Sequence, residues 1–271
     1  MIYKPARIFA LSFFALLIGV PSLVVILGTF KTTLEVSENP LGMPDSFNLN
    51  NYRELLSGGE LFQNFTNSMY VTLFSVLITL LLASFAAYAI SRMITVSGKV
   101  LFGLFAIGLA IPGQVNIVPI YQLFNQLGLL NSLNGLILIN ISTTLPISIF
   151  ILTSFFRELP REMFEVSEID GAGPFRTYRS IALPLSRPAM GATSIFLFVI
   201  NWNDLLYPLL LVTQSDKKTL PLAMLDYKGE YFTNFNMIFT AVIVASVPMI
   251  IMYLFMQRSF VAGLTAGAVK G

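Results

Sequence analysis

The sequence predicts an all-α membrane protein whose single domain, residues 1–271, crosses the bilayer with six transmembrane helices. Apolar residues make up 55% of the chain, charged residues make up only 11%, and the mean hydropathy is +0.77. A soluble core could not bury that much apolar surface. Several stretches exceed the roughly 20 apolar residues that cross about 30 Å of hydrocarbon. The expected spans are residues 8–30, 66–90, 100–124, 135–156, 189–212 and 237–257.

The first span follows a short basic segment, residues 1–7, as the apolar region of a signal peptide would. Its apolar run is too long for a signal peptide, and no small-residue cleavage site is evident, so we expect a retained span. Residues 31–65 are polar and contain Gly, Pro and Asn, which is typical of an external loop. The second span is rich in Ser, Thr and Ala, which let membrane helices approach closely.

The third span is interrupted at Pro112 and Pro119. Such interruptions free backbone groups in the membrane, which neighbouring helices or a wet cavity must satisfy. We therefore expect a bent helix beside a solute pathway. The fourth span contains Pro146 and follows an uncharged segment, residues 125–134, which is expected to be an interfacial turn.

A charged loop, residues 157–188, separates the fourth and fifth spans and contains a third of all charged residues. Its glycine and prolines predict two short helices. Pro160 is expected in the first turn of one helix, with Gly171 as its left-handed C-terminal cap. Pro174 is expected to start the second helix and Pro184 to close it.

Two stripes follow the helical spacing within the first of these helices. The apolar stripe consists of Met163, Val166 and Ile169, and the acidic stripe of Glu162, Glu165 and Glu168. Such a helix has one face that can dock on a partner and one that stays hydrated. An amphipathic loop that only links two spans is the alternative.

The fifth span leads to an external loop, residues 213–236, and the sixth span to a tail, residues 258–271. Six spans place both termini on one side of the membrane. If that side is the cytoplasm, eleven of the 16 basic residues lie inside, which fits the positive-inside rule. These eleven are Lys4, Arg7, Arg92, Lys99, Arg157, Arg161, Arg176, Arg179, Arg187, Arg258 and Lys270. The charged loop is then cytoplasmic.

Asp204 is the only acidic residue within an expected span. A charge near the bilayer centre costs on the order of 3 kcal/mol on insertion scales, so this side chain should face an aqueous cavity or a partner. One interpretation is a lining for a polar solute, in which amides donate hydrogen bonds and aromatic rings stack on a sugar. The other places Asp204 near the solvated end of its helix, with Trp202 and Tyr207 as interfacial anchors. The candidate pathway residues are Asn201, Trp202, Asn203, Asp204, Tyr207, Gln114 and Asn116. For the last two, hydrogen bonding between helices is the alternative.

The chain contains no cysteine and no histidine, which removes disulfides, thiol nucleophiles, imidazole acid–base chemistry and the usual zinc ligands. It contains no G-x-x-x-x-G-K-[ST] loop, so it should not hydrolyse ATP itself. We therefore expect no metal site, no catalytic residue and no enzymatic activity. Outside the cytoplasmic loops there is no basic face for nucleic acid.

The charged loop resembles the EAA loop of ABC importer permeases, which implies the type I permease fold. In that family the loop is a coupling helix that docks on an ATP-binding subunit. The residues that match or replace the motif, and to which the resemblance assigns coupling, are Glu165, Val166, Ser167, Ile169, Asp170, Gly171, Ala172, Leu183 and Pro184. Val166 and Ser167 stand where the family has two alanines, which is expected to make the docking helix bulkier.

Further motifs are similar to the smaller, maltose-type permease of the carbohydrate-uptake branch. They are the segments 112–121, 128–132 and 202–203 and the ending 263–271, GLTAGAVKG. In that branch the tail reaches the ATPase subunits, which implies contacts from Gly263, Thr265, Gly267 and Lys270. A frayed terminus is the alternative for this tail.

The resemblance implies a sugar or oligosaccharide importer in a prokaryotic cytoplasmic (inner) membrane. Its partners would be an ABC ATPase dimer that binds ATP and Mg, a second homologous permease, an extracytoplasmic solute-binding protein and membrane lipid. One alternative is import of a polyol or glycerol phosphate ester; the absence of Arg and Lys within the expected spans argues against a phosphate ester. An ion-coupled secondary transporter that uses Asp204 and a non-transporting assembly factor are the others.

Overall fold

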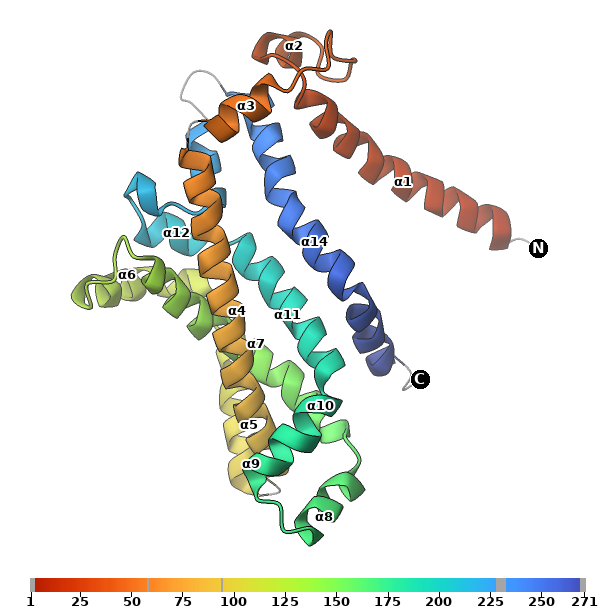
Figure 1. Ribbon diagram of the computed structural model, residues 1–271, viewed down its shortest axis with the longest axis vertical. Helices are drawn as coiled ribbons and strands as arrows, with labels where there is room; N and C mark the ends of the chain where they lie inside the picture. The colour runs from red at the N-terminus through yellow and green to blue at the C-terminus, as the bar shows by residue number, and fades with distance from the viewer. Residues whose placement is uncertain (1–2, 58, 94, 228–232, 269–271) are drawn as a thin grey trace. The chain divides into compact units, whose positions relative to one another are not determined.

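The computed structural model describes residues 3–57, 59–93, 95–227 and 233–268, and all regular elements within these ranges are helices (Figure 1). The prediction of an all-α chain is confirmed. Four helical stretches are long and apolar enough to cross a membrane, and two bent helix pairs raise the number of candidate spans to as many as six. The four are Lys4–Gly28, Glu60–Arg92, Leu133–Glu158 and Phe235–Phe255.

The contacts divide the chain into two compact units. The first unit contains residues 1–65 and 219–248, and the second contains residues 66–218 and 249–271. Two long helices, α4 (Glu60–Arg92) and α14 (Phe235–Ala268), have residues in both units.

The first unit is organised around a buried asparagine. Its helices outside α4 and α14 are α1 (Tyr3–Gly28), α2 (Thr33–Glu38), α3 (Asn50–Ser57), α13 (Leu220–Ala223) and η4 (Met224–Tyr227). The side-chain amide of Asn51 donates to the carbonyls of Thr29 and Lys31 at 2.7 and 2.9 Å, and its oxygen accepts from Asn236 at 3.0 Å. The expected external loop is thereby fixed both to the end of α1 and to the start of α14.

A capping box begins α2. The Thr32 hydroxyl accepts from the backbone N–H of Glu35, and the Glu35 carboxylate accepts from the backbone N–H of Thr32 at 2.6 Å. A second backbone N–H, from Asp45, donates to the same carboxylate at 3.0 Å. These hydrogen bonds to the charged form, with that from Thr32 the largest cause, hold the pKa of Glu35 below its ordinary value.

The third expected span, which lies in the second unit, consists of two helical segments separated by a break. Helix α5 (Val96–Ala110) and the pair η1 (Gly113–Asn116) and α6 (Ile117–Gln126) meet at 83°. The break falls at Ile111 and Pro112, which are both extended. Ile111 is extended because a residue before proline is pushed out of the α region. Pro119 lies inside the first turn of α6, where its missing N–H breaks no helical bond. The expected break is therefore confirmed at Pro112 and wrong at Pro119.

The segment expected to be an interfacial turn, residues 125–134, is tied to the end of α12 (Leu206–Leu211). Asn131 has a left-handed φ of 53°, and its side-chain oxygen accepts from both backbone N–H groups of Thr213 and Gln214, at 2.7 and 3.0 Å. Its own N–H donates to the Leu211 carbonyl at 2.8 Å. Ser132 then caps α7 (Leu133–Glu158). The cap and the left-handed residue explain why this short segment has a defined shape.

Small hydroxyl side chains are buried on both α4 and α7. Thr79 and Thr144 are buried, and their hydroxyls lie 3.4 Å apart. Thr72 and Ser75 on α4 and Ser148 on α7 are also buried. Residues this small let membrane helices approach closely, as the composition of the second span predicts.

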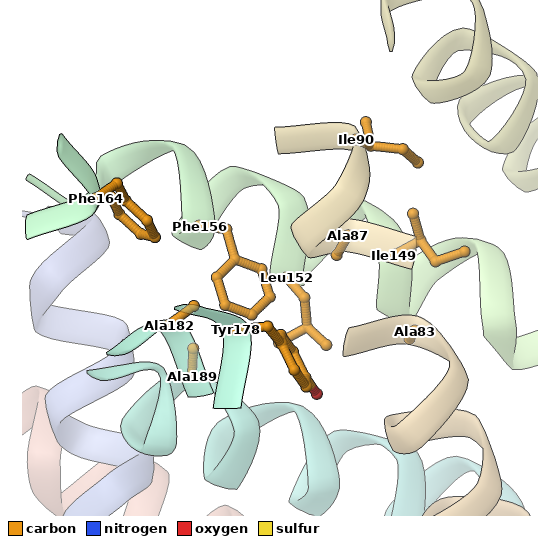
Figure 2. Packing of buried hydrophobic residues seen from close by; sticks show 10 residues of the cluster. All are labelled: Ala83, Ala87, Ile90, Ile149, Leu152, Phe156, Phe164, Tyr178, Ala182 and Ala189. Carbon is orange, nitrogen blue, oxygen red and sulfur yellow. The ribbon is translucent and has the colours of Figure 1, made fainter. Parts of the chain in front are cut away.

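A hydrophobic cluster joins α4 and α7 to the charged loop (Figure 2). Figure 2 shows the Phe156 ring among side chains from several elements, with Leu152 and Tyr178 close to it. The buried members of the cluster are Ala83, Ala87, Ile90, Ile149, Leu152, Phe156, Phe164, Tyr178, Ala182 and Ala189. The loop is thus packed against the helices that precede it.

Candidate functional site

The first helix of the charged loop is α8 (Arg161–Ile169). Pro160 is its N-cap residue, one position before the first turn in which it was expected. Gly171 has a φ of +71°, which confirms the predicted left-handed cap. The N–H of Ala172 donates to the Ser167 carbonyl and the N–H of Gly171 to the Glu168 carbonyl, each at 3.0 Å. This pair of bonds is the Schellman motif, so α8 has a rigidly defined end.

Helix α8 packs inward through a face that the two predicted stripes do not include. Phe164 is 4% exposed and Ser167 is 5% exposed. The apolar stripe points outward instead, since Met163, Val166 and Ile169 are 44%, 57% and 84% exposed. The loop therefore presents the apolar stripe on a helix that is already anchored to the rest of the protein. Exposed apolar side chains on an anchored element mark a surface for a partner.

Ser167 connects α8 to the next helix, α9 (Pro174–Thr177). Its hydroxyl lies 2.7 Å from the hydroxyl of Thr177, and both side chains are buried. Of the two residues that replace the family's alanines, only Val166 points outward. Val166 therefore adds bulk to the exposed apolar stripe, whereas the buried Ser167 adds none there, and for Ser167 the expectation of a bulkier outward face is wrong.

The second helical stretch of the loop continues past Pro184. A π-helical turn, η2 (Tyr178–Ala182), joins α9 to α10 (Leu183–Leu185), and α11 (Arg187–Trp202) follows after a 74° bend at Ser186. The prediction that Pro184 closes this helix is wrong. The N–H of Leu183 donates five residues back, to Tyr178, so the chain has already left the α-helical register where Pro184 lacks a donor.

Tyr178 holds the loop to α4. Its ring is 4% exposed, and its hydroxyl lies 2.7 Å from that of Ser84. Its ring centroid is 4.7 Å from that of Phe85 and 5.3 Å from that of Tyr88. Sequence reasoning missed this residue, because one tyrosine in a charged loop carries no periodic signal.

A small notch of about 190 Å³ lies between α8 and the π-helical turn. Val166, Asp170 and Arg176 line it, together with Ser180 and Ile181. The notch opens beside the apolar stripe and is lined by one acidic and one basic side chain. A partner could therefore contact both apolar and charged groups at this end of the loop.

Asp204 shapes the chain at the end of α11. One carboxylate oxygen accepts from the backbone N–H groups of Leu206 and Tyr207, at 3.1 and 3.5 Å, and so begins α12. The other oxygen is buried and has no hydrogen-bond partner among the described residues, and the same holds for the amide nitrogen of Asn201. The fifth expected span is therefore a helix, a turn at Asn203–Leu205 and a second short helix.

The aromatic residues near Asp204 are packed inside this unit. Trp202 is 2% exposed and stacks on Phe198, with ring centroids 5.6 Å apart and planes 9° apart. Tyr207 is 8% exposed. Both expectations for these rings, stacking on a solute and anchoring at the interface, require free surface and are not met here. The helical period of α11 turns residues 198 and 202 to the same side, where they pack together.

Tyr207 reaches the break between α5 and α6. A Cβ atom at Gly113 would lie 2.7 Å from the Tyr207 hydroxyl oxygen, so only glycine fits there without a shift. The structure thus joins two candidate regions that lie far apart in the sequence. The neighbouring candidates Gln114 and Asn116 are exposed, as is Asn203.

The predicted tail continues the last helix. Gly263, Thr265 and Gly267 fall within α14, which has no break at residue 258. Lys270 lies outside the described residues. Elsewhere in the described ranges, no cluster of three or more acidic side chains could hold a metal ion.

Up to six candidate spans and an anchored amphipathic loop between two of them indicate a multi-pass membrane protein with a surface for a partner. A family model described as a binding-protein-dependent transport system inner membrane component matches residues 79–265. The chain therefore belongs to this family of ABC importer permeases, whose members are transport components rather than enzymes.

Individual relatives cover nearly the whole chain. The diacetylchitobiose uptake system permease protein NgcG of Streptomyces coelicolor is 32% identical over 258 residues, which are 94% of this chain and 85% of that protein. The multiple sugar-binding transport system permease protein MsmG of Streptococcus mutans is 33% identical over 259 residues, with coverages of 94% and 93%. A chain in the crystal structure of a bacterial ABC transporter involved in the import of the acidic polysaccharide alginate has a TM-score of 0.84 at 18% identity, with 96% of both chains covered.

Proposed function

We propose that this permease moves a sugar or oligosaccharide across the cytoplasmic membrane and that a separate ATPase docks on the charged loop. The observation that carries the proposal is the exposed apolar stripe of α8, which is held on an anchored and capped helix. The two named relatives are permeases of a diacetylchitobiose system and of a multiple sugar-binding system, which supports a carbohydrate as the solute.

The hydrogen bonds of the loop suggest how motion passes from the ATPase into the membrane. A force on α8 reaches α9 through Ser167 and Thr177, and reaches α4 through Tyr178 and Ser84. ATP must favour one arrangement of the permease over the other for this force to shift the equilibrium. The solute is then released on the cytoplasmic side by alternating access.

The proposed assembly contains an ABC ATPase dimer, a second homologous permease and an extracytoplasmic solute-binding protein. ATP and Mg are bound by the ATPase. Both termini and the charged loop face the cytoplasm, as the distribution of basic residues predicts. The residues of α14 from Gly263 to Gly267 are proposed as further ATPase contacts, and Lys270 with them.

Val166→Asp is expected to release the ATPase. The side chain is 57% exposed, so the fold should tolerate the change, whereas a carboxylate buried in an apolar interface loses its hydration without a partner. The measurement is a mild-detergent pull-down with an N-terminal tag, followed by mass spectrometry of the co-purified subunits. We expect ATPase recovery to fall about tenfold, while the second permease is retained.

Val96→Asp is the matched control, because Val96 is the first residue of α5 and is 76% exposed, on the side predicted to be cytoplasmic. It should leave ATPase recovery unchanged. Equal recovery with both variants would contradict docking on α8. A wild-type chain that purifies alone and moves solute in vesicles without ATP would overturn the importer assembly and favour ion-coupled transport.

A further inference from the structure

A cavity of about 500 Å³ lies behind the charged loop, between the C-terminal end of α4 and helices α8 and α9. Its walls are largely aromatic: Phe85 and Tyr88 come from α4, Phe164 from α8, and Phe175 from α9. Phe175 is 64% exposed and Phe85 is 40% exposed, so the aromatic wall continues to the surface. An elongated apolar chain could follow this wall.

The charged residues that line this cavity are one cation, Arg92, and one anion, Glu168. The Arg92 guanidinium lies over the Phe164 ring, 3.5 Å from its centroid. Its Nε has no hydrogen-bond partner, and no ion pair involves Arg92 or Glu168 in the described part of the chain. The two charges are therefore held near each other without neutralising one another by contact.

A molecule that fits this cavity therefore has a negative group for Arg92, a positive group for Glu168 and an apolar part for the aromatic wall. A phosphate satisfies a guanidinium better than any neutral acceptor, because two of the five guanidinium N–H donors can bond two phosphate oxygens at once. A primary ammonium group would pair with the carboxylate. Acyl chains would cover the aromatic rings. A zwitterionic phospholipid with an ethanolamine headgroup combines all three.

We propose that this cavity binds the headgroup of a phosphatidylethanolamine molecule from the adjacent leaflet, with its phosphate on Arg92 and its ammonium on Glu168. Arg92 lies two positions beyond the expected second span, residues 66–90, which puts it close to the level of the headgroups. The bound lipid would fill the space between the charged loop and α4.

The test is native mass spectrometry of the detergent-purified full chain, incubated with equal amounts of phosphatidylethanolamine and phosphatidylglycerol of the same acyl composition. The wild type should retain the ethanolamine lipid about fivefold better than the glycerol lipid, because only the former pairs with Glu168. Arg92→Gln should lose both lipids. Glu168→Gln should remove the preference and retain the two lipids equally.

Lys99→Gln and Glu162→Gln are the matched controls, since each removes the same type of charge from a nearby exposed residue that does not line the cavity. Both should bind as the wild type does. If Arg92→Gln fails to fold, the wild type and the exposed Glu168→Gln variant still decide the outcome. Equal retention of the two lipids by the wild type, or an unchanged preference in Glu168→Gln, would overturn the proposal. Because the readout is lipid retention, it does not depend on the ATPase or on transport.

Discussion

Replacement of Gly171 by valine is expected to lower ATP-driven solute uptake about tenfold or more, while the protein still inserts in the membrane. Gly171 has a φ of +71°, and a β-branched residue is strongly disfavoured in that conformation. No atom lies within 4 Å of the place where its Cβ would be, so the effect comes from the backbone alone. The substitution should distort the cap of α8 and misplace the apolar stripe.

Gly173→Val is the matched control for this prediction. Gly173 lies two residues further on, has an extended backbone with a φ of −69° and a ψ of 164°, and also has open space at its Cβ position. Uptake in vesicles that contain the complete transporter is the measurement, normalised to the amount of inserted protein. A similar loss with both valines would show that bulk, rather than the left-handed cap, matters. Normal uptake with Gly171→Val would refute the coupling role of α8.

Phe156→Ala is expected to lower the free energy of unfolding by about 3 kcal/mol or more, because large-to-small changes in a packed core leave a cavity. Phe156 is 1% exposed in the cluster that joins α7 to the charged loop, and its ring makes an edge contact with Tyr88 at 6.0 Å. In Figure 2 the ring lies among cluster side chains that come from α4, α7 and the loop. The loss should also loosen the base on which α8 is held.

Phe196→Ala provides the comparison, since Phe196 lies on α11 and is 41% exposed. Its removal should change the unfolding free energy by a small fraction of the Phe156 effect. Unfolding of the detergent-purified chain with increasing denaturant, followed by circular dichroism, measures both. Comparable losses for the two variants would mean that the cluster does not stabilise the loop.

Local chemistry explains why much of the loop could be predicted. The Gly171 cap, the start of a helix at Pro174 and the break at Pro112 depend only on the backbone preferences of those residues and their neighbours. Pro184 was mispredicted because proline is compatible with a first helical turn as well as with a helix end. Only the preceding π-helical turn selects between these two cases.

The contacts of the residues around Asp204 could not be predicted from local chemistry. The sequence identified Asp204 and the aromatic residues around it, but periodicity cannot say which neighbour a ring will meet. Trp202 stacks on Phe198, and the Asp204 carboxylate is used to begin α12. Both outcomes depend on packing between segments, which is not visible in a local pattern.

The sequence by itself determined the all-α class, the membrane location and the outline of the charged loop, because apolar length, charge distribution and turn residues act locally. The family followed from the resemblance of its motifs, and the family model confirms it. Only the tertiary structure decided which face of α8 is anchored and which is free. It also decided that Tyr178 contacts Ser84, residues 94 positions apart, and that Arg92 and Glu168 share one cavity. The physical reason is that side chains distant in the sequence compete for the same buried space, and close packing allows one arrangement.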